Sequence, residues 1–144
     1  NNASSQFEIG EVCQHTPGML MMIDLDSFKL VNDLYGHDMG DKVLIRFAEI
    51  IRSAIRSADI AGRMGGDEFI VILDGESEDL CRDSLLRFRT NLSKKNETLR
   101  DYYIKASWGH AFISEVKDYA VQECYMLADE RMYNMKKAHK GVRT

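Results

Sequence analysis

The chain has 144 residues, 44% hydrophobic and 29% charged, a balance typical of one folded domain and not of a disordered chain. Its net charge of −4 argues against nucleic-acid binding, which requires a basic surface. The three cysteines are far apart and form no CxxC pair, which favours free thiols in a reducing cytoplasm over a zinc site or disulfides. Wholly apolar runs such as MLMMI are too short to span a bilayer, so we expect no membrane contact by this domain.

The first predicted elements are a weak helix over residues 4–15 and a buried strand over 19–26, MLMMIDLD. A short apolar run that follows a turn and ends in acids fits a sheet better than a helix. Within this strand Asp24 and Asp26 share a face, because side chains alternate with a period of two. Asp26 also suits the N-cap of the helix that follows.

Two helices are predicted next. The first is short and covers residues 27–36, with Gly36 as a natural stop. The second runs from about 41 to 58, and three-and-four spacing defines one buried face, made of Leu44, Phe47, Ala48, Ile51 and Ile55.

A β-hairpin is predicted around Gly65-Gly66, because a two-residue glycine link joins two strand-like segments, DIAGRM and DEFIVIL. An amphipathic helix follows, with Cys81, Leu85, Phe88 and Leu92 on one side. A strand region over 102–113 and a last helix over about 119–138 complete the chain. Strands interleaved with helices indicate one sheet with helices packed on it, in a single domain over 1–144.

Acidic residues lie at two strand ends, Asp24 at the first strand and Asp67-Glu68 at the hairpin. If these strands are neighbours, three carboxylates converge, and their repulsion raises their pKa values unless a cation is present. All-oxygen ligation points to Mg²⁺ or Mn²⁺, and Mg²⁺ commonly combines one or two carboxylates with substrate phosphates. Taken alone, each acid is better explained as a solvated residue at the end of a strand.

Several motifs at matching intervals resemble the GGDEF family of diguanylate cyclases. GGDEF itself stands at 65–69, and DLDSFKLVNDLYGHDMGD at 24–41 is similar to the family's other long signature. ASWGHA at 106–111 fits its late strand, and LADERMYNMKKAHKG at 127–141 resembles its closing helix. The likeness covers essentially the whole chain. The chain opens with NNASS and no initiator Met, so we expect a domain cut from a longer protein.

The resemblance implies an α+β fold, an α/β sandwich with a palm-like, ferredoxin-like sheet. This sheet would be mostly antiparallel, with about five strands and helices packed around it, as in nucleotide cyclases. It also implies synthesis of cyclic di-GMP from two GTP with release of pyrophosphate, two Mg²⁺ or Mn²⁺ ions per active site, and a homodimer of GTP-loaded domains. The location would be cytoplasmic, with any membrane anchor in a missing N-terminal region.

The resemblance assigns the metal and catalytic roles position by position. Asp24 would bind the metals through its carboxylate, Leu25 through its backbone carbonyl, and Asp67 through its carboxylate. Asp67 is also the candidate base, and Glu68 would assist the metal site or the proton transfer. The choice of proton acceptor between these two acids stays open.

The remaining substrate contacts follow in the same way. Asn32 and Asp41 would read the guanine edge, since an amide and a carboxylate match its acceptors and donors. The backbone amides of Phe28 and Lys29, at a helix start, suit the outer phosphates. Further contacts are expected from residues that shape the guanine pocket or neutralise phosphate: His37, Lys136 and Lys140.

Two sequence features qualify the resemblance. The family usually closes with KxxGRN, whereas this chain has His139 for the glycine and Lys140 for the arginine, which loses a two-pronged phosphate contact. The second feature, RSAD at 56–59, resembles the family's RxxD inhibitory site for cyclic di-GMP. Arg56 and Asp59 would bind the product there, joined by Arg87. A surface Arg–Asp pair at a helix end is the alternative.

A catalytically silent GGDEF module, which binds GTP or cyclic di-GMP for regulation, is the main alternative to an active cyclase. The intact motif argues against it, and the Lys140 replacement is the local feature in its favour. A different palm-like nucleotidyl cyclase is disfavoured, because the combination of Asn32 and Asp41 favours guanine over adenine.

Overall fold

The computed structural model describes residues 17–56, 59–74, 77–100 and 102–142, so the helix predicted over 4–15 lies outside the described part. Its centre is a four-stranded sheet in the order β2-β3-β1-β4, and every neighbouring pair is antiparallel. The strands are β1 (Pro17–Leu25), β2 (Ile60–Arg63), β3 (Glu68–Asp74) and β4 (Ala106–Phe112). About five strands were expected, and four are present among the described residues.

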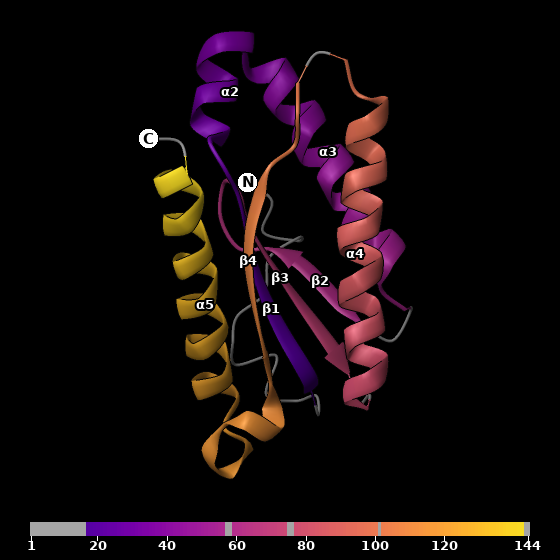
Figure 1. Ribbon diagram of the computed structural model, residues 1–144, viewed down its shortest axis with the longest axis vertical. Coiled ribbons are helices and arrows are strands. Elements are labelled where there is room, and N and C mark those ends of the chain that lie inside the picture. The colour runs from indigo at the N-terminus through magenta and orange to yellow at the C-terminus, as the bar shows by residue number, and fades with distance from the viewer. Residues whose placement is uncertain (1–16, 57–58, 75–76, 101, 143–144) are drawn as a thin grey trace.

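The helices cover both faces of this sheet, with α5 on one face and α3 and α4 on the other (Figure 1). The short α2 lies with the start of α3 at the end of the sheet where β1 finishes (Figure 1). Helices on an antiparallel sheet give the predicted α+β, palm-like fold. Their bounds, with two 3₁₀ turns, are α2 (Phe28–Tyr35), α3 (His37–Ala54), α4 (Glu78–Thr98), η2 (Ile113–Glu115), η3 (Lys117–Tyr119) and α5 (Val121–Val142).

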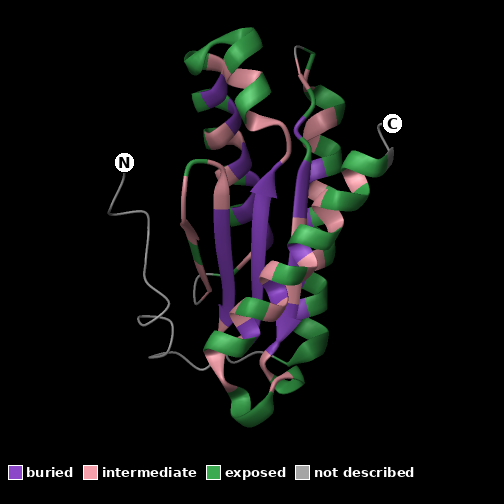
Figure 2. Cartoon of the chain, turned by 90° about the vertical axis from the view of Figure 1, so that its left-hand side faces the viewer, coloured by how far each residue is buried: buried purple, intermediate pink, exposed green. Residues whose placement is uncertain are grey.

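Alternation along β1 builds two hydrophobic cores. Met19, Met21 and Ile23 face α3 and α4, whereas Leu20 and Met22 face α5. Both sides of the central strands are therefore buried, while the outer surfaces of the helices are exposed (Figure 2). Asp24 continues the Leu20–Met22 side of the strand, which places its carboxylate on the α5 face.

The helix predicted over 41–58 differs in its bounds and in part of its buried face. α3 starts at His37 and ends at Ala54, because Gly36, at φ 90°, both ends α2 and precedes α3 without a linker. Ile55 has extended backbone and leads toward β2. The buried positions of α3 are Gly40, Val43, Phe47, Ile50, Ile51 and Ala54, so only Phe47 and Ile51 of the predicted face are fully buried.

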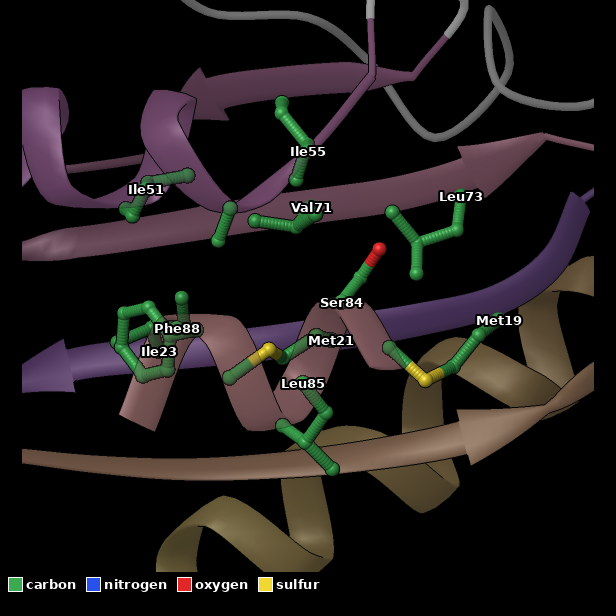
Figure 3. A pocket seen from close by; sticks show the side chains of 11 residues that line it. Met19, Met21, Ile23, Ile51, Ile55, Val71, Leu73, Ser84, Leu85 and Phe88 are labelled. Atoms are coloured by element: carbon green, nitrogen blue, oxygen red, sulfur yellow. The ribbon is translucent and has the colours of Figure 1, made fainter. Parts of the chain in front are cut away.

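An internal cavity of about 10 Å³ lies between β1, β3, α3 and α4 (Figure 3). Apolar side chains from these elements surround it, and the hydroxyl of Ser84 is the polar group among them. The cavity lies on the opposite side of the sheet from the Asp24 carboxylate, and a space of this size holds no nucleotide.

α5 lies unusually close to β4, which fixes the helix along the edge of the sheet. A Cβ added at Gly109 would come within 2.2 Å of the Ala128 carbonyl oxygen, so this contact requires glycine. The Trp108 N–H donates to Met135 Sδ at 3.1 Å, and Arg131 donates to the His110 carbonyl at 2.9 Å. These side chains cover backbone groups of an edge strand. No helix in the described ranges is long and apolar enough to cross a membrane.

Candidate active site

The hairpin turn is tied directly to the end of β1. Asp24 pairs with Glu68 in the β1–β3 register, and the Leu25 N–H donates to the Asp67 carbonyl at 3.0 Å. The Met64 N–H closes the turn by donating to the Glu68 carbonyl at 2.8 Å. The strands are therefore neighbours, which is the condition that the sequence analysis set, and they bring Asp24, Asp67 and Glu68 together.

The electrostatics of these acids show how closely they lie. Burial raises the pKa of Asp67, and the charge and hydrogen bond of Asp24 raise it further. Burial also raises the pKa of Glu68, with further increases from the charges of Asp24, Asp67 and Asp129. Such shifts record negative charge that lacks full compensation, which is the condition that a bound cation relieves.

Lys136, on α5, supplies part of the missing positive charge. Its ammonium group binds Asp24 Oδ2 although 112 positions separate the two residues. Burial lowers the pKa of Lys136, but the hydrogen bond to Asp24 and the charges of Asp24, Asp67 and Asp26 outweigh it, and the net shift is upward. The predicted phosphate-binding lysine thus lies at the predicted metal site.

The residues present fit a divalent cation. Asp24 Oδ1 is buried and has no hydrogen-bond partner among the described residues, which leaves an acceptor available to a positive ligand. Within the described ranges, no three His, Cys, Asp or Glu side chains form a ready-made metal cluster. The expected donor set needs none, because it consists of two carboxylates, Asp24 and Asp67, and the Leu25 carbonyl. Mg²⁺ completes such a set with water and phosphate oxygens.

The predicted guanine contacts lie on α2 and α3, which pack against each other. A Cβ added at Gly40 would lie 1.9 Å from Asn32 Oδ1, so the missing side chain is what allows Asn32 to rest against α3. Asp41 follows Gly40 and is exposed, as is His37, the first residue of α3. The structure therefore places Asn32 against Gly40, the residue before Asp41.

The predicted phosphate-binding amides belong to the first turn of α2. Phe28 and Lys29 open this helix, where backbone N–H groups have no intrahelical acceptor. The Lys29 side chain is exposed and pairs with Asp33 at 3.0 Å.

Asp26 does not cap α2, which corrects the sequence prediction. The N-cap position is Ser27, in a left-handed conformation without a side-chain capping bond. The Asp26 carboxylate instead accepts a hydrogen bond from Ser107 Oγ at 2.7 Å, and its Oδ2 lies 2.7 Å from His139 Nδ1. The sequence analysis assigned no role to His139 or Ser107. A signal was available, because His139 lies three residues after Lys136 and so shares its face of the helix.

A small pocket of about 30 Å³ adjoins these residues at the ends of β1 and α5. Lys140, the replacement for the family's arginine, lines this pocket together with Lys136. Lys105, which precedes β4, also contributes and was not predicted. The complete lining is Asp26, Ser27, Lys105, Lys136, His139 and Lys140.

The predicted inhibitory residues gather at the C-terminal end of α3. The Arg56 N–H donates to Asp59 Oδ2 at 2.8 Å, and Asp59 Oδ1 accepts from the Asp74 N–H at 3.1 Å. Arg87, on α4, donates twice to the Ala54 carbonyl, at 3.1 and 3.3 Å. The Arg87 guanidinium therefore closes the end of the helix that Arg56 follows.

Comparison with known proteins gives one family match, "Diguanylate cyclase, GGDEF domain", over residues 3–141. Diguanylate cyclase DgcS of Shewanella oneidensis is 39% identical over 120 residues, which cover 81% of this chain and 38% of that protein. The chain thus spans well under half the length of this relative.

Two solved structures have a similar fold. Diguanylate cyclase SiaD of Pseudomonas aeruginosa, solved in complex with its activator SiaC, has a TM-score of 0.76 at 25% identity. The match covers 95% of this chain and 60% of SiaD. A microbial GGDEF domain, described in an interaction with cyclic di-GMP, has a TM-score of 0.69 at 31% identity, covering 85% of this chain and 74% of that domain.

Proposed function

The chain belongs to the GGDEF family of diguanylate cyclase domains, and from that premise we propose that it condenses two GTP molecules into cyclic di-GMP. The observation that supports this most strongly is the junction of β1 with the hairpin. There Asp24, Asp67 and Glu68 meet beside the Lys136 ammonium group, and a buried Asp24 oxygen lacks a partner among the described residues.

The reaction is two phosphoryl transfers. The 3′-hydroxyl oxygen of one GTP forms a bond to the α-phosphorus of the other, the bond to the β-phosphate breaks, and pyrophosphate leaves. The reverse pairing closes the ring and releases a second pyrophosphate. The hydroxyl proton passes to a carboxylate, Asp67 or Glu68, and the raised pKa of each makes it a better acceptor near neutral pH.

Asp24, Asp67 and the Leu25 carbonyl would hold Mg²⁺ or Mn²⁺, two ions per site. When bound, these ions stabilise negative charge on phosphate and acidify the attacking hydroxyl. The chain's own residues position the substrate. Lys136 and Lys140 neutralise phosphate charge from α5, and the first-turn amides of α2, from Phe28 and Lys29, bind the outer phosphates.

Guanine recognition is assigned to α2 and α3. Asn32 and Asp41 pair with the base edge, and His37 shapes the pocket beside them. The close packing of Asn32 over Gly40 supports this assignment, because it holds the Asn32 carboxamide against α3 at the residue before Asp41.

A separate product site supports feedback inhibition in this proposal. Arg56, Asp59 and Arg87 would bind cyclic di-GMP at the end of α3, with guanidinium groups on phosphate and guanine. The hydrogen bond from Arg87 to Ala54, near the start of the RxxD segment, supports this grouping.

The chain would work as a homodimer, because one set of site residues serves one GTP and the reaction needs two. It would form part of a longer cytoplasmic protein, on the side of the membrane where GTP is made. The match to DgcS covers only 38% of that relative, which is consistent with a longer protein.

A silent module that binds nucleotide without reacting is the second candidate, favoured by Lys140 at the arginine position. One experiment separates the two. The chain, fused to a dimeric coiled coil, is incubated with GTP and Mg²⁺ and the products are separated by chromatography. An active cyclase gives cyclic di-GMP, and Asp67→Asn lowers its formation at least about hundredfold, the usual range for an essential charged group. Absence of product with tight nucleotide binding would instead establish the module.

A further inference from the structure

Three side chains from α5, β4 and the turn after β1 form a hydrogen-bonded network beside the acidic site. His139 Nδ1, on α5, lies 2.7 Å from Asp26 Oδ2 and 3.0 Å from Ser107 Oγ. Ser107, on β4, donates to Asp26 Oδ1 at 2.7 Å. Ser107 is fully buried, and the Asp26 side chain is only 8% exposed. We refer to these three residues as the anchor network.

The anchor network is attached to the rigid end of the sheet. The Asp26 N–H donates to the Lys105 carbonyl at 2.8 Å, which joins the segments that follow β1 and precede β4. β1 and β4 are paired along the full length of β4, as far as the Leu25–Ala106 pair. His139 is thus fixed to backbone whose position the central strands determine.

The network's helical member lies among the phosphate-binding lysines. Lys136 is three residues before His139, and Lys140 is the next residue along α5. All three line the small pocket together with Lys105, so three lysine residues contribute to the wall of a space of about 30 Å³. That space admits a phosphate oxygen but no base.

We propose that His139 is a positioning residue whose bonds to Asp26 and Ser107 hold the last turns of α5 so that Lys136 and Lys140 meet the outer phosphates of the nucleotide. The inference rests on the proposed function, because that function gives the lysines their ligand. Helix ends fray where no tertiary contact holds them, and α5 ends at Val142.

The need for such an anchor follows from Lys140 itself. An arginine presents a planar fork that is organised before it meets phosphate, whereas a lysine is a point charge on a flexible stem. A lysine therefore depends more on where its backbone is held. The closing pattern of the family, KxxGRN, has glycine at the position of His139. Glycine has no side chain that could bond to Asp26 and Ser107, whereas His139 does.

The test measures nucleotide binding without turnover. Dissociation constants are determined by calorimetry, with Mg²⁺, for a GTP analogue with a methylene group between the α and β phosphorus atoms, and for GMP. The variants are His139→Ala, which removes the anchor, and His139→Asn, whose amide nitrogen replaces Nδ1. Asn134→Ala is the control, since Asn134 is exposed on the same helix.

We expect His139→Ala to weaken binding of the analogue about three- to tenfold, the effect of a displaced but not deleted phosphate contact, with GMP affinity unchanged. His139→Asn restores most of the loss, and Asn134→Ala has no effect. In a chain that already carries Lys136→Ala and Lys140→Ala, His139→Ala produces no further loss. Thermal unfolding confirms that each variant is folded.

Equal loss for GMP and the analogue, or the same loss with and without the two lysines, would overturn the inference, since the network would then act on the fold alone. Failure of the wild-type chain to bind either nucleotide would overturn it together with the proposed function. A wild-type chain that binds the analogue but makes no cyclic di-GMP contradicts only the cyclase, and the dissociation constants still decide the role of His139.

Discussion

The carboxylate of Asp24 has two charged neighbours, Lys136 and Asp67, whose charges act on it in opposite directions. Lys136 binds one of its oxygens and compensates its charge, whereas Asp67 adds a second negative charge in the same partly buried place. One ammonium group therefore serves several carboxylates, and the metal-free site keeps a residual repulsion. The ion that the site is proposed to hold would remove it.

This repulsion gives a stability prediction for Asp67→Asn. Because the folded chain raises the pKa of Asp67 above its ordinary value of 3.8, the folded state binds more protons than the unfolded state between the two pKa values. Stability of the wild type therefore falls as the pH rises through that window, and the loss is complete above the folded pKa. Without metal at pH 7, we expect Asp67→Asn to unfold at a higher temperature than the wild type. Its free energy of unfolding should be greater by at most about 1 kcal/mol, since water still screens the carboxyl.

The measurement is thermal unfolding at several pH values, with Asp83→Asn, an exposed acid on α4, as the control for loss of charge. The difference in unfolding temperature between Asp67→Asn and the wild type should vanish below about pH 4. Mg²⁺ should raise the unfolding temperature of the wild type more than that of the variant. A variant less stable than the wild type throughout would show that Asp67 supports the metal-free fold.

Residue-level prediction succeeded for the acids and failed for their neighbours for one reason. Alternation along β1 and the glycine turn determine where Asp24 and Asp67 lie, and both patterns are local. The partners of Asp26 are residues 81 and 113 positions away, so no local pattern could distinguish an N-cap from a tertiary contact. Local capping preference was outweighed by packing of the strand end against α5.

At the level of elements, the end of α3 differs from the sequence prediction, which placed it at about 58. The apolar spacing continues to Ile55, but the helix stops at Ala54, where Arg87 donates twice to the Ala54 carbonyl. A contact from α4 decided this boundary, and helix propensity does not encode it. β1, β2 and β3 were predicted to within two residues at each end, because short runs between turns leave little freedom, whereas β4 begins at Ala106 and not at 102.

The same helix end carries the prediction for feedback inhibition. We expect Arg56→Ala to raise the cyclic di-GMP concentration needed for half inhibition at least about tenfold, because a charged phosphate contact is lost. The initial rate should stay within about twofold, since Arg56 lies at the far end of α3 from His37. Arg52→Ala, an exposed arginine in the last turn of α3, is the control. An unchanged inhibition curve would reject the assignment of this site.

On the scale of the whole molecule, the chain is half of the proposed catalyst. The described part of the chain places one Asp24–Asp67 junction at one end of one sheet, and two GTP molecules must exchange roles in the reaction. A two-fold axis is the simplest symmetry that presents each 3′-hydroxyl to the other α-phosphate. In this proposal, dimer formation therefore controls the rate. The rate per chain depends on the concentration of chains wherever that concentration changes the fraction of chains in dimers.

The most direct measurement is the rate of cyclic di-GMP formation per chain, followed by chromatography with GTP and Mg²⁺ over a range of chain concentrations. The rate per chain should rise with concentration until dimers predominate, remain constant for a coiled-coil fusion, and be lost in Asp67→Asn. A constant rate per chain in a sample shown to be monomeric, or product formation that survives Asp67→Asn, would contradict the proposed mechanism.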